Sequence, residues 1–105
     1  MKIVGVTSCS TGIAHTYMAA EGIKKAAKKL GYKSKIETQG SIGTEDKLSE
    51  KDIADADLII ISSDVSIAGK ERFDGLDKVY KTGSEPFIVD ADNTLKSAFE
   101  SIEEH

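Results

Sequence analysis

The chain has 105 residues, carries 14 basic and 18 acidic side chains, and has a formal net charge of −4 with a pI near 5.1. A chain of this size folds around one hydrophobic core, and its acidity excludes a general attraction to nucleic acid or to an anionic membrane surface. One cysteine excludes an internal disulfide framework, and no apolar run approaches the ~20 residues of a membrane span, so we expect a cytoplasmic domain without direct membrane insertion.

The first half of the chain alternates between strand and helix patterns. Residues 3–6 form a short apolar run that is typical of a strand buried on both faces. From residue 13 to 30, apolar residues recur at spacings of three and four between lysines, which predicts an amphipathic helix that ends at Gly31 in a left-handed cap. Residues 32–38 alternate in the manner of a half-exposed strand near a sheet edge, and a glycine loop follows at 39–43.

The second half repeats this alternation. Residues 49–52, Ser-Glu-Lys-Asp, resemble a helix N-cap with an acid at the third position and predict a short helix. Residues 58–61 are apolar and largely β-branched, which predicts a central strand. Residues 65–76 favour a short helix followed by a turn. A last strand at 87–89, introduced by proline, and a last helix capped by Asp92 complete the prediction.

This order of elements, βαβαβαβα, predicts an α/β fold. We expect a single domain over residues 1–105, built as a Rossmann-like three-layer sandwich: a four-stranded parallel sheet, in the strand order 2-1-3-4, with helices on both faces. Residues 103–105 are either native or the remnant of a purification tag. In such open sheets, ligands bind beyond the carboxyl ends of the strands. Cys9 lies at that end of the first strand.

The surroundings of Cys9 favour a reactive thiol. Residues 7–16 read TSCSTGIAHT and join the first strand to the first helix. Backbone N–H groups at a helix N-terminus stabilise a thiolate and bind phosphate oxygens, while Gly12 and its small neighbours leave room for a phosphoryl group. The predicted phosphate-binding loop comprises Ser10, Thr11, Gly12, Ile13, Ala14, His15 and Thr16.

The opposite interpretation is that Cys9 is a small buried hydrophobic residue, because free cysteines are among the most buried residue types. The position between strand and helix, with glycine and hydroxyl-bearing neighbours, argues against it. A free thiol titrates near ~8.5, and such surroundings lower its pKa enough to make a nucleophile at neutral pH.

Three segments carry a resemblance to a known family: residues 9–16 (CSTGIAHT), residues 37–41 (ETQGS) and the pair Arg72-Phe73. Together they resemble the fructose-type IIB domains of the bacterial phosphoenolpyruvate-dependent sugar phosphotransferase system, essentially from end to end. One difference is Ser10, because the family commonly has proline directly after the cysteine. Proline would fix a backbone angle and remove an N–H group, so serine loosens the loop and adds a donor.

The resemblance implies a role for Cys9 as a phosphocysteine nucleophile. In the family, this cysteine accepts a phosphoryl group from a phosphohistidine on the IIA component and passes it to a sugar bound in the membrane IIC permease. The resemblance therefore implies uptake of fructose or a related sugar, a cytoplasmic domain peripheral to the inner membrane through IIC, and no metal, cofactor or nucleic acid.

Several other residues are candidates for the rim of this site. Asp64 follows the predicted third strand, but a carboxylate repels phosphate, so ordering of its own loop is the simpler role. Arg72 is suited either to an acidic partner or bound phosphate, or to a surface ion pair. A plain flexible loop is as consistent with residues 39–41 as a contact role. The predicted rim or partner contacts are Gln39, Gly40, Ser41, Asp64 and Arg72.

His15 bears on the main alternative, a low-molecular-weight phosphatase of the cysteine type. Such enzymes place an arginine that grips phosphate bidentately at the position that His15 occupies here. His15 fits either a general acid beside the phosphate or a solvated capping side chain. A redox-sensing thiol also stays open. A Rossmann dinucleotide site lacks its glycine motif, a receiver domain lacks its carboxylates, and a flavin site lacks aromatic residues near these loops.

Overall fold

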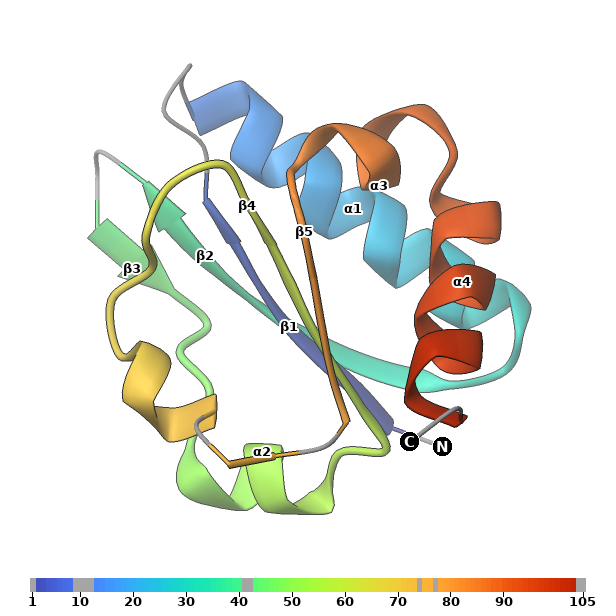
Figure 1. The fold of residues 1–105 in the computed structure, drawn as a ribbon. Coiled ribbons are helices and arrows are strands. Elements are labelled where there is room, and N and C mark those ends of the chain that lie inside the picture. The colour runs from blue at the N-terminus through green and yellow to red at the C-terminus, as the bar shows by residue number, and fades with distance from the viewer. Residues whose placement is uncertain (1, 9–12, 41–42, 74, 77, 104–105) are drawn as a thin grey trace.

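The computed structural model describes residues 2–8, 13–40, 43–73, 75–76 and 78–103 (Figure 1). One mixed sheet, in the order β3-β2-β1-β4-β5, forms the centre; β1, β2, β4 and β5 are parallel, and β3 is antiparallel to β2. In chain order, the elements are β1 (Lys2–Ser8), α1 (Ile13–Lys29), β2 (Lys33–Gly40), β3 (Gly43–Glu45), α2 (Glu50–Asp55), β4 (Leu58–Ser63), the 3-10 helix η1 (Lys70–Phe73), β5 (Val79–Thr82), α3 (Glu85–Val89) and α4 (Ala91–Glu103).

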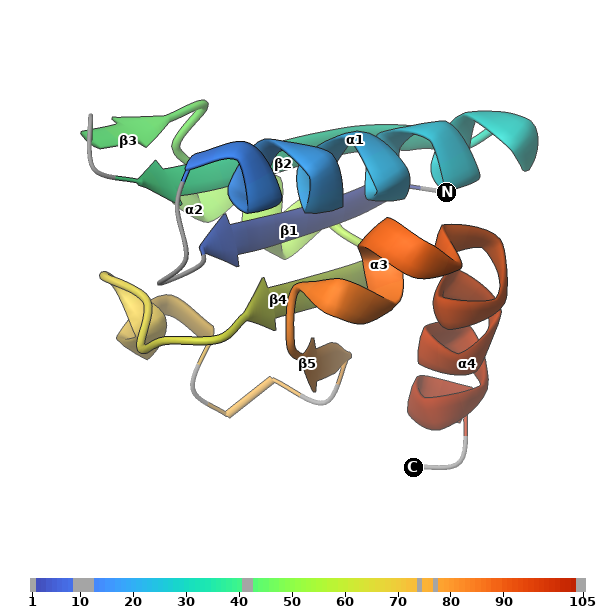
Figure 2. The same cartoon turned by 90° about the horizontal axis from the view of Figure 1, so that it is seen from above.

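Helices cover both faces of the sheet. Helices α1, α3 and α4 lie together on one face, and α2 and η1 lie on the other (Figures 1 and 2). Successive side chains of a strand point to opposite faces of the sheet, so each strand contributes residues to the cores on both faces. In β4, Leu58 and Ile60 pack on the α1 side, whereas Ile59 and Ile61 pack on the η1 side. The predicted α/β layering is confirmed.

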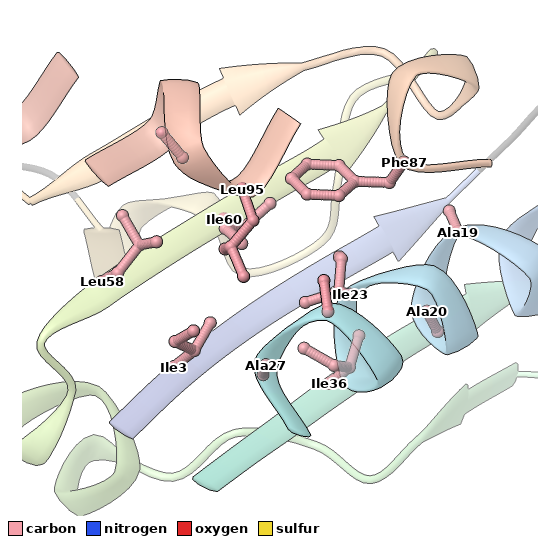
Figure 3. Close-up of a cluster of buried hydrophobic side chains, with 12 residues drawn as sticks. Ile3, Ala19, Ala20, Ile23, Ala27, Ile36, Leu58, Ile60, Phe87 and Leu95 are labelled. Atoms are coloured by element: carbon pink, nitrogen blue, oxygen red, sulfur yellow. The ribbon is translucent and has the colours of Figure 1, made fainter. Parts of the chain in front are cut away.

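The larger core lies under α1, α3 and α4. Phe87 of α3 is fully buried there, beside Ile60 of β4 and Ile23 of α1 (Figure 3). A Cβ atom added to Gly22 would lie 2.1 Å from the Phe87 carbonyl oxygen, so the close approach of α1 and α3 requires glycine at that position. Apolar burial on this face therefore fixes α3 against α1 and, with it, the chain that follows β5.

The start of the chain folds as the sequence predicts. Strand β1, helix α1 and strand β2 are present, and Gly31 after α1 has a φ of 75°. Ser49 and Asp52 form a reciprocal capping box at the start of α2, with the Asp52 N–H donating to Ser49 Oγ at 3.1 Å and the Ser49 N–H donating to Asp52 Oδ2 at 3.0 Å.

Two parts of the sheet prediction are wrong. The sheet has five strands rather than four, because Gly43–Glu45 pairs with β2 where a loop was expected, with Gly40 opposite Gly43. The fourth parallel strand is Val79–Thr82 and not residues 87–89. The parallel strands nevertheless run in the predicted order, since β2-β1-β4-β5 are the second, first, third and fourth parallel strands of the chain.

Residues 87–89 are helical because Pro86 occupies the first turn of α3, where a missing N–H group and a fixed φ are favourable. Asp92 was also misplaced as the cap of the last helix. The cap of α4 is Asp90, whose backbone oxygen accepts from the Thr94 N–H at 3.1 Å and whose carboxylate accepts from Asn93. Asp92 lies in the first turn of α4 and pairs with Lys29 at 2.8 Å.

Candidate functional site

The carboxyl edge of the sheet is lined by polar residues. Ser8 ends β1 and is paired with Gln39 of β2 on one side and with Ser63 of β4 on the other. On β5, Thr82 is paired with Ser62. Apolar residues precede this row in the two central strands, β1 and β4. The sheet therefore brings the ends of four parallel strands to one rim, at the point where Ser8 leads directly into Cys9.

Cys9, Ser10, Thr11, Gly12 and Ser41 lie outside the described residues. The residues on either side of the 9–12 segment are held together, because Thr7 Oγ1 donates a hydrogen bond to the Thr16 carbonyl oxygen at 3.0 Å. Both threonines are almost fully buried. The end of β1 is thus fixed against the first turns of α1, and the separation of the two ends of this segment is set by the core.

The first turns of α1 combine electrostatics that favour an anion with one buried polar atom that has no partner among the described residues. They contain no acidic residue, so no carboxylate of that turn offsets the partial positive charge of the helix N-terminus. Ala14 and His15 are exposed. Thr16 Oγ1 is buried and has no hydrogen-bond partner in the described part of the chain. Such a group costs free energy unless it finds a partner.

Asp64 orders the loop that follows β5. Its N–H donates to the Ser8 carbonyl oxygen at 3.2 Å, and its carboxylate accepts from the Ser84 N–H at 3.1 Å and from Ser84 Oγ at 2.5 Å. Ser62 Oγ donates to the Gly83 carbonyl oxygen at 2.8 Å in the same region. These contacts place Asp64 at the predicted rim and direct its carboxylate to Ser84.

The guanidinium of Arg72 is enclosed by the chain itself. It forms a two-point contact with Glu37, at 2.9 Å and 3.1 Å, and its remaining N–H groups donate to the carbonyl oxygens of Gly69, Leu48 and Ala68 at 2.7 to 3.2 Å. The Glu37 side chain is only 1% exposed. Five donors meet five acceptors, so this guanidinium is fully used inside the protein.

Gln39 completes the same network. Its amide nitrogen donates to Glu37 at 2.7 Å and to the Ala68 carbonyl oxygen at 2.9 Å, while its amide oxygen accepts from the Ala68 N–H at 2.8 Å. Glu37, Gln39 and Arg72 together fix residues 68–72 against β2. The rim position predicted for Gln39 is therefore occupied by a side chain that holds a neighbouring loop.

Burial and hydrogen bonding shift the pKa of Glu37 in opposite directions. Burial alone would raise the pKa of its carboxyl group, but hydrogen bonds from Arg72, Gln39 and the Leu48 N–H together outweigh it, so the pKa of Glu37 lies below its usual value. The same contact with Glu37 raises the pKa of Arg72 above its usual value, against the opposing effect of burial. The pair is charged at neutral pH.

Sequence reasoning missed most of this network. Glu37 was expected, with Lys33 and Lys35, on one face of a half-exposed strand, and it also belongs to a segment of the family resemblance, but neither predicted a buried carboxylate. Thr7 and Ser84 were not singled out. The one available signal was the composition of β2, where Glu37 and Gln39 share a face by the period of two. In the described residues, no helix is long and apolar enough to cross a membrane, and no group of three His, Cys, Asp or Glu side chains is placed to hold a metal ion.

Comparison with known proteins identifies the family. A family model described as "PTS system, Lactose/Cellobiose specific IIB subunit" matches residues 4–97. The chain belongs to this family of PTS IIB proteins. A solution structure of the Enzyme IIB subunit of a PTS system from Escherichia coli K12 superposes on this IIB chain with a TM-score of 0.88 and 39% identity, covering 98% of this chain and 94% of that one.

The curated relatives carry fructose in their names. The PTS system fructose-like EIIB component 2 of Escherichia coli K12 is 45% identical over 99% of this chain and 93% of its own length. The PTS system fructose-specific EIIB'BC component of Xanthomonas campestris is 47% identical over 92% of this chain, which spans only 16% of that larger protein. The IIB unit thus occurs among relatives both by itself and within a longer chain.

Proposed function

We propose that this IIB domain, residues 1–105, is a phosphoryl carrier in sugar uptake. Cys9 accepts a phosphoryl group from a phosphohistidine of the IIA component and passes it to fructose or a related sugar held by the membrane IIC permease. In this chain of the IIB family, Cys9 follows Ser8 in the sequence, and Ser8 ends β1 at the carboxyl edge of the sheet. This observation carries the proposal, together with the hydrogen bond that joins Thr7 to Thr16 on either side of residues 9–12.

The two steps exchange one bond for another. In the first, the P–N bond to the donor histidine breaks while a P–S bond forms at Cys9. In the second, the P–S bond breaks while a P–O bond forms to a sugar hydroxyl, whose proton passes to a base or to solvent. Phosphoryl transfer has a loose transition state, so the protein mainly positions the group and supplies donors around its oxygens.

The first turns of α1 provide for this chemistry. Backbone N–H groups over residues 10–16 are the proposed cradle, and the absence of an acid in the first turn of α1 leaves the helix N-terminus attractive to phosphate. The buried Thr16 hydroxyl, which has no described partner, supports a ligand at this end of the helix. His15, exposed beside the cradle, is the proposed general acid.

The side chains of Arg72 and Asp64 near the rim favour transfer of the phosphoryl group to a sugar over hydrolysis of the phosphocysteine. Arg72 is the only arginine in the chain, and Glu37 and three carbonyl oxygens occupy its donors, so it does not supply the grip of a cysteine phosphatase. The carboxylate of Asp64 is engaged by Ser84. We therefore propose that the phosphocysteine persists until a sugar hydroxyl arrives.

Membership of the IIB family supports two proposed partners, the IIA component and the IIC permease. The IIA component acts as the donor, and the IIC permease brings the sugar to a cytoplasmic IIB domain that is peripheral to the inner membrane. The names EIIB'BC among the relatives support a permease partner. Residues 39–41 are the proposed rim contacts for these partners, alongside the ordering role of Gln39. No cofactor or metal takes part in the proposed transfer.

A phosphorus NMR experiment tests the proposal. The protein is incubated with phosphoenolpyruvate, the general phosphotransfer proteins and a fructose-type IIA, beside a Cys9→Ser variant. A thiophosphate resonance is expected from the wild type and not from the variant. An active donor that produces no such resonance would reject the role. Steady turnover of an aryl phosphate by the wild type would instead support the phosphatase alternative.

A further inference from the structure

A small hollow lies beside the carboxyl edge on the η1 face of the sheet, and no role described so far uses it. Its volume is about 310 Å³. Ser63 of β4 connects it to the site, because Ser63 is paired with Ser8, the residue before Cys9. We call it the Lys70–Lys81 hollow, and its described lining comprises Ile61, Ser63, Val65, Ser66, Ile67, Lys70, Phe73, Lys81 and Thr82.

The charge of this hollow is opposite to that of the chain. Lys70 and Lys81 are both exposed, and neither ammonium group has a hydrogen-bond or ion-pair partner among the described residues. The described lining contains no acidic side chain. A protein with a net charge of −4 thus presents, next to its proposed phosphoryl site, two lysines whose ammonium groups have no partner in the part of the chain that the structure describes.

The floor and walls of the hollow are well ordered by the core. Ile61, Ile67 and Phe73 are buried beneath it. Lys70 belongs to η1, which the Arg72 contacts hold against β2. Lys81 lies on the same face of β5 as Val79, which packs against this core. The backbones that carry the two ammonium groups are therefore fixed before any partner arrives, which lowers the entropy lost on binding.

We propose that the Lys70–Lys81 hollow is the docking site for a carboxylate side chain, Asp or Glu, on the surface of the soluble phosphoryl donor. This inference rests on the proposed phosphoryl relay. A carboxylate is complementary in charge to two ammonium groups, and its aliphatic stem fits an apolar floor. The membrane permease is the poorer match, because cytoplasmic loops of membrane proteins are enriched in Lys and Arg and would be repelled here.

Charge reversal tests the inference. Lys70→Glu/Lys81→Glu is compared with the matched control Lys33→Glu/Lys51→Glu, which changes the net charge equally at exposed positions in β2 and α2. The measured quantity is the second-order rate of phosphoryl transfer from phosphorylated IIA. We expect a loss of at least about tenfold for the hollow variant at low salt. The loss shrinks near about 1 M salt, where the screening length falls to roughly 3 Å.

The reactivity of Cys9 with iodoacetamide separates docking from chemistry. The rate of alkylation needs no partner. Measured near about 1 M salt, where the screening length is roughly 3 Å and the reversed charges act little on the thiolate, it is expected to be the same in the wild type, the hollow variant and the control. A wild type that accepts no phosphoryl group would remove the relay and the docking site together. A wild type that is phosphorylated, with a hollow variant phosphorylated as fast, would overturn the docking site alone.

Three further outcomes would also overturn it. One is an equal loss in the control variant, which would indicate net charge rather than the hollow. Another is a defect confined to the later transfer to sugar in IIC-containing membranes, which would assign the hollow to the permease. The third is inhibition of wild-type transfer by millimolar inorganic phosphate but not by chloride of equal ionic strength, relieved in the hollow variant, which would make the hollow a site for small anions.

Discussion

On the β2 side of the carboxyl edge, the guanidinium of Arg72 is enclosed by Glu37 and three backbone carbonyl oxygens, whereas on the β4–β5 side the ammonium groups of Lys70 and Lys81 have no described partner. Lys70 and Arg72 belong to the same 3-10 helix. Arg72, whose guanidinium is enclosed by fixed acceptors, contributes to the stability of the fold, whereas the exposed Lys70 and Lys81 are available to bind a partner. Stability and partner binding should therefore respond to different residues of one short element.

The largest expected effect is on the Arg72 side. Arg72→Met leaves the Glu37 carboxylate buried without its cation, and breaking a buried pair in this way costs about 3–5 kcal/mol in the free energy of unfolding. Urea denaturation measures it. Glu37→Gln/Arg72→Met, which removes both charges, should recover a large part of the loss. A single variant within about 1 kcal/mol of the wild type would contradict the assignment of Arg72 to folding.

A smaller effect is expected at Gln39. Gln39→Ala leaves the Ala68 N–H without its side-chain acceptor, removes one of two side-chain donors to the Ala68 carbonyl oxygen, and removes one donor to Glu37. The expected cost is about 1–2 kcal/mol in the free energy of unfolding, since the lost partners are neutral and partly reached by water. Hydrogen exchange should speed up at the Ala68 N–H before it does in β1. Unchanged protection of this N–H would remove Gln39 from the network.

The pH dependence of stability reports on Glu37. Its folded pKa is lowered, so its contribution is fully present above the unfolded value of about 4.3 and is lost as pH falls through the folded pKa. The difference in unfolding free energy between the wild type and Glu37→Gln should be constant from about pH 8 to pH 5 and should shrink below about pH 4.3. A difference that grows on acidification would mean that the pKa is raised.

The smallest expected effect on stability is on the other side of the comparison. Lys70→Glu/Lys81→Glu should change the free energy of unfolding by no more than about 0.5 kcal/mol, because both side chains are exposed and neither has a described partner. Thermal and urea unfolding should agree on this. A loss comparable with that of Arg72→Met would show that the lysines, too, belong to the folding framework.

The sequence predicted the elements whose signal is local. The apolar run of β1, the spacing in α1, Gly31 and the Ser49 capping box each depend on neighbouring residues, and all are present in the structure. The last parallel strand is residues 79–82 and not 87–89 for two reasons. One is local, because Pro86 suits the first turn of a helix, and the other is tertiary. Phe87 is buried against α1, and this packing outweighs the strand propensity of an apolar run.

Other features had no signal along the chain. Strand β3 has three exposed residues and no hydrophobic pattern, and its pairing with β2 places Gly40 opposite Gly43. Arg72 and Glu37 are 35 positions apart in the sequence. The sequence showed both residues, but it carried no signal that their side chains are in contact. The assignment of Cys9 came from its place after a strand and from family resemblance, and it stays a prediction.

The most direct test of the relay is the intact mass of the protein after incubation with phosphorylated IIA. The account predicts that the wild type gains one phosphoryl group, that the Cys9→Ser variant gains none, and that the gain disappears when IIC-containing membranes and the transported sugar are added. A wild type whose mass does not change with an active donor, or a Cys9→Ser variant that gains and passes on the group equally well, would contradict it.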